Sequence, residues 1–120
     1  MLTYNNLIEK ALEKLPEFKK AYNELPNKLV YEDSGSHIVF ELVFANELMK
    51  LIKDKNISAN DFFDFMVDMI ESKDVKVQEV CEQSVIESIC DEFTDEQLKP
   101  FLPTQLESTV RDVREYIPSN

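Results

Sequence analysis

The sequence predicts an all-α protein, a single-domain bundle of about six to seven helices packed as antiparallel hairpins. One glycine and five prolines in 120 residues leave little material for the tight turns of β-hairpins. Glu, Lys and Leu favour helices and are abundant, and apolar residues recur at intervals of three and four along much of the chain. An apolar content of 43% is enough for one buried core, so we expect residues 1–120 to form a single helical domain.

Two helices are expected near the amino terminus. Thr3 is a suitable N-cap for a helix that reaches residue 14, and Pro16 then separates this helix from the next one. A shorter helix over residues 17–25 would end before Pro26. The apolar positions expected to face inward are Leu7, Ile8, Ala11, Leu12 and Leu15 in the first helix, and Phe18, Ala21, Tyr22 and Leu25 in the second.

Residues 29–44 are open to two interpretations. They could form a β-hairpin around Gly35, the only glycine of the chain. We favour a long central helix over residues 36–55, because its apolar residues follow the 3.6-residue period and occupy more than one side. Those residues are Phe40, Phe44, Leu48, Leu51 and Ile52, widened by Val39, Leu42 and Val43.

The later helices begin at recognisable caps. In a capping box a hydroxyl accepts from the third amide of the helix, and the third side chain reaches back to the cap residue. This spacing predicts helices over 59–72, 95–102 and 105–116, and Asp74 is a suitable N-cap for another helix that ends near residue 91. The three boxes are Ser58 with Asp61, Thr94 with Gln97, and Thr104 with Glu107; the last helix would bury Leu106, Val110, Val113 and Ile117.

The negative charge of the chain is concentrated in residues 61–96. The whole chain carries a net charge of −11, and this stretch contributes −10, with twelve carboxylates against two lysines. Residues 1–60 hold eight lysines against nine acids, and residues 97–120 are balanced. A field of one sign confined to one region attracts oppositely charged partners and repels nucleic acid. We therefore predict a binding surface for a basic partner, a protein and not a nucleic acid.

Four of these acids share one side of the helix predicted over 59–72, because they are spaced by three, four and three residues. The acids of the next helix are expected on an adjoining outer surface. The inward apolar residues of this helix are Phe62, Phe63, Phe65, Met66, Met69 and Ile70. Of these, Phe63 is placed toward the exposed side, as an apolar anchor among the acids. A face that serves only solubility is the alternative, although such faces usually interleave both signs of charge. The predicted partner-binding residues are Asp61, Phe63, Asp64, Asp68, Glu71, Glu79, Glu82, Glu87, Asp91, Glu92, Asp95 and Glu96.

No catalytic residue, metal site or cofactor is predicted, and we do not expect an enzyme. His37 is the only histidine and is interpreted as a surface or capping residue, and the chain has no Gly-rich phosphate loop and no EF-hand pattern. Cys81 and Cys90 would lie about 13 Å apart on one helix, too far for a disulfide, and are interpreted as reduced core thiols. The amino terminus does not resemble a secretory leader and no apolar run could span a membrane, so we expect a cytoplasmic protein.

Residues 62–75 (FFDFMVDMIESKDV), followed by Val80 and by residues 84–89 (SVIESI), resemble the middle of a group of small, acidic, helical bacterial proteins. That group includes immunity proteins of polymorphic or contact-dependent toxin systems. The resemblance implies an antitoxin that binds the toxin domain delivered by a neighbouring cell and blocks its active site. Nuclease toxins bind phosphate and are often basic, so such a toxin would complement an acidic face. The alternative is an intracellular protein–protein interaction module, or a regulator of a nucleic-acid-binding protein.

Overall fold

Helices make up all the regular structure in the part of the chain that the computed structural model describes, residues 2–24 and 35–116. The predicted all-α class is therefore confirmed. In chain order the elements are η1 (Tyr4–Asn6), α1 (Leu7–Lys14), η2 (Pro16–Phe18), α2 (Lys19–Asn23), α3 (Gly35–Val39), η4 (Phe40–Phe44), α4 (Ala45–Lys53), α5 (Ala59–Ile70), α6 (Val75–Glu79), η5 (Val80–Ile86), α7 (Glu87–Glu92), α8 (Asp95–Leu98) and α9 (Thr104–Tyr116).

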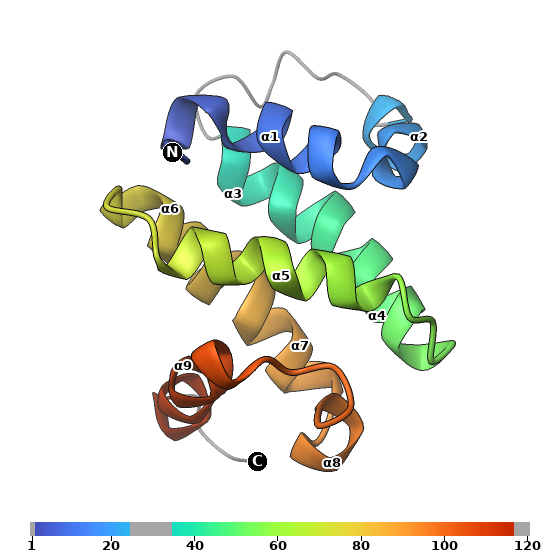
Figure 1. Cartoon of the computed structure of the whole chain (residues 1–120), viewed down its shortest axis with the longest axis vertical. Helices are drawn as coiled ribbons and strands as arrows, with labels where there is room; N and C mark the ends of the chain where they lie inside the picture. The colour runs from blue at the N-terminus through green and yellow to red at the C-terminus, as the bar shows by residue number, and fades with distance from the viewer. Residues whose placement is uncertain (1, 25–34, 117–120) are drawn as a thin grey trace.

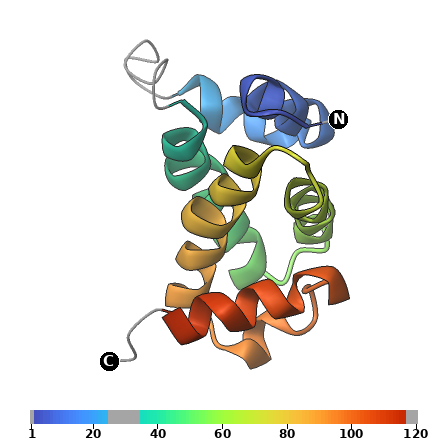
Figure 2. The ribbon, with the colours of Figure 1, turned by 90° about the vertical axis from the view of Figure 1, so that its left-hand side faces the viewer.

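Two long helices form the centre of the molecule. The elements α3, η4 and α4 continue as one helix over residues 35–53, and α6, η5 and α7 continue as another over residues 75–92. They pack side by side in the same direction, since α3 and η4 contact η5 while α4 contacts α7. The helix α5 crosses in front of them, α1 and α2 cover one end, and α8 and α9 cover the other (Figures 1 and 2). The radius of gyration of 13.6 Å equals the value of about 13.6 Å expected for one compact domain of this length.

An aromatic cluster joins α5 to the amino-terminal elements and the first long helix. Phe18 follows Pro16 in η2, and its ring centroid lies 5.9 Å from that of Phe44 and 5.5 Å from that of Phe62. Phe40 meets Phe44 edge to face at 4.6 Å. All four rings are at most 2% exposed, so truncating any of them to alanine should cost about 3–5 kcal/mol of stability.

Both long helices contain a π-helical segment, which a regular 3.6-residue pattern does not predict. The amide of Ala45 donates to the carbonyl of Phe40, and that of Glu87 donates to the carbonyl of Glu82, each spanning five residues. The two segments, η4 and η5, contact each other where the long helices pack. Most apolar side chains of the two segments are buried, although Leu42 remains 47% exposed.

Three of the predicted helix starts are confirmed. The Thr3 amide donates to Asn6 Oδ1 at 2.8 Å, and the Lys76 amide donates to Asp74 Oδ1 at 3.0 Å. At α8 the full capping box forms. Its two bonds run from the Thr94 amide to Gln97 Oε1 at 2.9 Å and from the Gln97 amide to Thr94 Oγ1 at 3.3 Å.

The predicted box of Ser58 with Asp61 is wrong. Ser58 has a helical backbone conformation and its side chain makes no cap hydrogen bond. The preceding Asn56 replaces it, because its Oδ1 accepts from the Ser58 amide at 2.9 Å and so turns the chain before α5. At α9 the helix begins at Thr104 itself, one residue earlier than predicted.

The long central helix is confirmed and the second arm of the alternative hairpin is excluded, because residues 35–44 are helical. Residues 29–34 lie outside the described ranges, as do Leu25 and Ile117. The helix ends at Lys53, two residues before the predicted end, because Lys55 adopts a left-handed conformation with φ of 54°. Within the described ranges, none of the helices has both the length and the apolarity needed to cross a bilayer.

Candidate protein-binding surface

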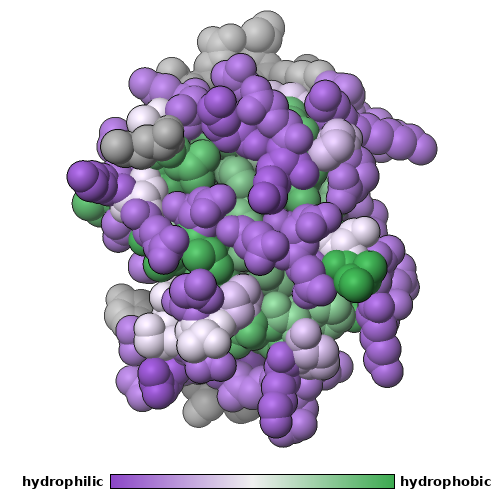
Figure 3. All heavy atoms as spheres, viewed as in Figure 1, coloured by the Kyte–Doolittle hydropathy of each residue, from purple (hydrophilic) through white to green (hydrophobic). Residues whose placement is uncertain are grey.

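Four carboxylates form a continuous acidic surface on the outward side of α5, here called the α5 acidic face: Asp61, Asp64, Asp68 and Glu71. All four are exposed, and none of them forms an ion pair with another described residue. The opposite side of α5 is buried against the core through Phe62, Phe65, Met66 and Met69, which confirms the predicted division of this helix. Figure 3 shows polar side chains covering much of the outward surface around α5.

This arrangement lowers the stability of the helix. The three consecutive pairs of the α5 acidic face are spaced by three or four residues, and each like-charged pair at that spacing costs about 0.2–0.5 kcal/mol. Asp61 lies in the first turn and gains from the helix dipole, whereas Asp68 and Glu71 lie at the carboxyl end, where the dipole opposes negative charge. The α5 acidic face therefore costs the free protein part of its stability.

A second acidic cluster forms where the long helix 75–92 meets α9. It includes Asp112 of α9, a residue that the sequence does not single out. Burial raises the pKa of Glu82, and the nearby carboxylates of Glu79 and Asp112 raise it further. Asp112 belongs to a stretch of balanced charge, and only the packing of α9 against η5 brings it close to Glu82. Because Glu79 and Glu82 are half-buried, they are less accessible to a partner than the α5 acidic face.

The acids near the carboxyl end of helix 75–92 are partly neutralised by cations from elsewhere in the chain. Glu92 pairs with Lys53 at 3.0 Å, and Asp95 pairs with Arg114. Arg114 also donates to the carbonyl oxygens of Cys90 at 3.0 Å and Phe93 at 2.7 Å, so it holds α9 against the end of α7. The pairing of Asp95 is thus part of the tertiary structure.

The remaining predicted acids lie apart from the α5 acidic face and differ in exposure. Glu87 is half-buried, whereas Asp91 and Glu96 are exposed, and Glu96 lies beside a groove described below. Asp74, one of the twelve carboxylates in the charged stretch, caps α6 and accepts from the Tyr4 amide at 2.8 Å. The predicted acids therefore do not form one uniform surface. Among the described residues, the α5 acidic face is a set of four exposed carboxylates without ion pairs that share one side of a single helix.

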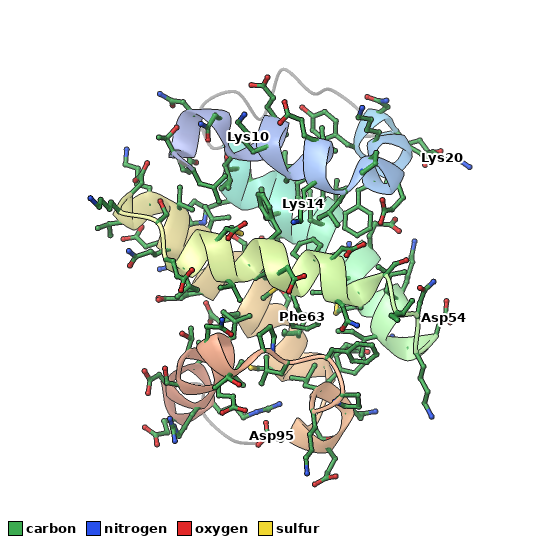
Figure 4. The ribbon with its side chains drawn as sticks, viewed as in Figure 1. Lys10, Lys14, Lys20, Asp54, Phe63 and Asp95 are labelled. Atoms are coloured by element: carbon green, nitrogen blue, oxygen red, sulfur yellow. The ribbon has the colours of Figure 1, made fainter. Side chains whose placement is uncertain are left out.

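The predicted exposure of Phe63 is wrong, because its side chain is 0% exposed. It extends from α5 toward the carboxyl-terminal helices (Figure 4) and stacks on Phe101, with ring centroids 6.4 Å apart and planes 13° apart. The pattern within α5 places Phe63 beside the buried face. Only the packing of the carboxyl-terminal region against that side of the helix decides that it is covered.

A groove of about 690 Å³ opens beside this stack. Its apolar lining comes from Ile52, Ile57, Phe93, Pro100 and Phe101, and its polar border comes from Lys53, Lys55, Asn60, Glu96 and Gln97. Apolar surface is visible below α5 on the right-hand side of Figure 3. The sequence does not predict this groove because two segments far apart in the chain, residues 52–60 and 93–101, form it. The isolated apolar residue Ile57 within a polar turn is a signal of it.

The histidine and the two cysteines of the chain are packed against or within the core. His37 is half-buried at the start of the first long helix, and its Nδ1 lies 3.2 Å from Oγ of the buried Ser84 on the second. Its predicted surface position is therefore only partly right. Cys81 and Cys90 are free and buried, as predicted, and burial raises the pKa of both thiols. Among the described residues, no group of three or more His, Cys, Asp or Glu side chains is arranged to hold a metal ion.

Comparison with known proteins finds one family. A model of a domain of unknown function, DUF7674, matches residues 8–117, which is nearly the whole chain. No curated protein and no solved structure matches the chain.

Proposed function

The chain belongs to the family of the domain of unknown function DUF7674, and we propose that it is a binding protein that docks a cationic partner protein on the α5 acidic face. The observation that carries the proposal is the set of four exposed carboxylates on one side of α5, with no cation paired to them within the described ranges.

The cost of this surface in the free protein supports a binding role. The repulsion along α5 amounts to roughly 0.6–1.5 kcal/mol over three pairs, and a basic partner would convert it into attraction. Elsewhere the chain places opposite charges together, as in the pairs of Lys10 with Glu13 at 3.5 Å and Lys50 with Glu47 at 3.3 Å. The helix α5 carries no lysine or arginine, so its four carboxylates have no cation on their own helix to pair with.

The electrostatic role would be mainly kinetic. Exposed charges attract a partner over distances of about 10 Å at moderate salt and raise the association rate, while buried apolar contacts slow dissociation. The same field disfavours nucleic acid, whose phosphates are also negative.

The resemblance to immunity proteins suggests a specific partner class, a basic toxin domain of the nuclease type. In that case the α5 acidic face would occupy the toxin surface that binds phosphate, and the toxin would be encoded beside this protein. A regulator of a nucleic-acid-binding protein would use the same electrostatics with a different neighbour, so the identity of the partner separates the two classes.

The test begins with the product of the adjacent reading frame, purified with this protein after coexpression. Stopped-flow association is then measured for the wild type and for a double variant, Asp64→Lys with Asp68→Lys, across a range of sodium chloride concentrations. We expect the double variant to associate at least about tenfold more slowly at low salt and to lose most of its salt dependence, because steering by one charged face is worth about that much.

The control is Glu107→Lys combined with Glu115→Lys, which makes the same change of net charge at two exposed positions of a different helix, α9. Its association rate should fall much less. Equal slowing by both variants would mean that overall charge alone matters, and an unchanged rate in the α5 variant would refute the proposal.

A further inference from the structure

The groove beside the Phe63–Phe101 stack has a rigid floor. Phe101 rests on the fully buried Phe63, and its amide donates to the Leu98 carbonyl at 2.9 Å. Ile52 is 4% exposed and Phe93 is 5% exposed, so both are held by the core behind the groove. A site whose walls are already fixed loses little conformational entropy when it is filled.

Ile57 forms an exposed wall of the groove. Its side chain is 78% exposed, more than the other large apolar side chains found on the surface of the described residues, Leu42 at 47% and Val75 at 61%. The turn that carries Ile57 is well defined. The Lys55 amide donates to the Ile52 carbonyl at 3.0 Å, and the Asn56 amide donates to the Leu51 carbonyl at 2.9 Å. These two bonds are those of a Schellman motif, which ends α4 with Lys55 in the position that glycine usually occupies.

The two borders of the groove carry opposite charges. Lys53 and Lys55 lie on the border formed by the end of α4, and Glu96 lies on the border formed by α8. Lys53 is engaged by Glu92. Among the described residues no ion pair engages Lys55 or Glu96, so the lining of the groove offers one cation and one anion, each from a different segment, to a partner.

We propose that this groove binds an amphipathic helix of a partner protein, with apolar side chains on the floor, a basic flank against Glu96 and an acidic flank against Lys55. The proposal rests on the proposed function in taking the same partner: the α5 acidic face would steer it, and the groove would hold it. Addition of an extended peptide to a sheet needs a free strand edge, and the described residues contain no strand, so we take a helix as the occupant and test an extended proline-rich peptide against it. The volume of about 690 Å³ accommodates a few side chains of one helix face.

The proposal is tested with a synthetic helical peptide of about four turns. It carries leucines at positions i, i+3, i+4 and i+7, lysines along one edge and glutamates along the other. A second peptide has the two charged edges exchanged, and a third is an extended proline-rich peptide. Binding to the full chain is measured by fluorescence anisotropy and mapped by amide chemical shifts in NMR. We expect the first peptide to bind at the groove and the second to bind more weakly.

Ile57→Ser should weaken binding of the first peptide by about tenfold, the size expected for an apolar anchor. Val75→Ser is the matched control, because it removes an exposed aliphatic side chain at the start of α6 and should leave binding unchanged. Both side chains are exposed, so far-UV circular dichroism should show both variants folded. Equal effects of the two variants, equal binding of the edge-exchanged peptide, tighter binding of the proline-rich peptide, or shifts that map outside the groove would each overturn the proposal.

The two proposals fail separately. If Ile57→Ser accelerates dissociation of the natural partner while the Asp64 and Asp68 double variant leaves association unchanged, the groove stands and the steering role falls. The reverse result removes the groove and leaves the α5 acidic face.

Discussion

Replacing Asp68 with lysine is expected to stabilise the unbound protein. Asp68 is exposed, lies four residues after Asp64 and three before Glu71, and occupies the last turn of α5. A lysine there removes two repulsive pairs, creates two attractive ones and places a positive charge at the carboxyl end of the helix dipole.

The expected gain follows from these pairs. Four changes of about 0.2–0.5 kcal/mol each amount to about 1–2 kcal/mol, before any contribution from the dipole. For a domain of this length that corresponds to an increase in melting temperature of roughly 4–8 °C. Because the residues are exposed, the gain should shrink strongly in 1 M salt, where the Debye length falls to about 3 Å.

The free energy of unfolding is measured by urea denaturation at pH 7, at low salt and in 1 M sodium chloride. The matched control is Glu107→Lys, which changes the net charge equally but places lysine in the first turn of α9, four residues before Arg111. That variant should be destabilised. If both variants gain stability to the same extent, relief of the overall charge explains the effect, and the reasoning from the α5 acidic face is refuted.

Three further predictions concern single side chains. Glu82→Gln should stabilise the protein at pH 7 and make little difference at acidic pH, because burial in the folded state raises the pKa of Glu82 above its ordinary value, so that native stability falls as pH rises through the raised pKa. Urea titrations across pH would show whether the difference between variant and wild type follows this sign. Lys55→Gly should add about 0.5–1 kcal/mol to the free energy of unfolding, because glycine adopts the positive φ without strain. A loss of stability in urea would contradict the assignment of a Schellman motif with Lys55 at its left-handed position. Arg114→Ala should lower the free energy of unfolding by about 2–3 kcal/mol, because the hydrogen bonds to two carbonyl groups and to Asp95 are lost. Arg114→Lys should recover only part of this loss, because one ammonium cannot span all three acceptors, and full recovery by lysine in thermal melts would refute that explanation.

The sequence alone predicted the features that depend on local chemistry. The helical class follows from the 3.6-residue apolar pattern and from the scarcity of glycine, and the caps at Thr3, Asp74 and Thr94 each depend on residues only two or three positions apart. The exposure of the α5 acids is of the same kind, because one helix face is set by the spacing of its own residues.

Only the tertiary structure decided which side chains meet across the chain. Phe63 is buried because Phe101, 38 positions later, covers it. Burial raises the pKa of Glu82, and the carboxylates of Glu79 and of Asp112, which α9 brings close, raise it further. The groove next to Ile57 likewise exists only where residues 52–60 and residues 93–101 converge. A periodic pattern shows which face of a helix is apolar. Whether a side chain at the edge of that face is buried, forms an ion pair or lines a groove depends on neighbours that are distant in sequence.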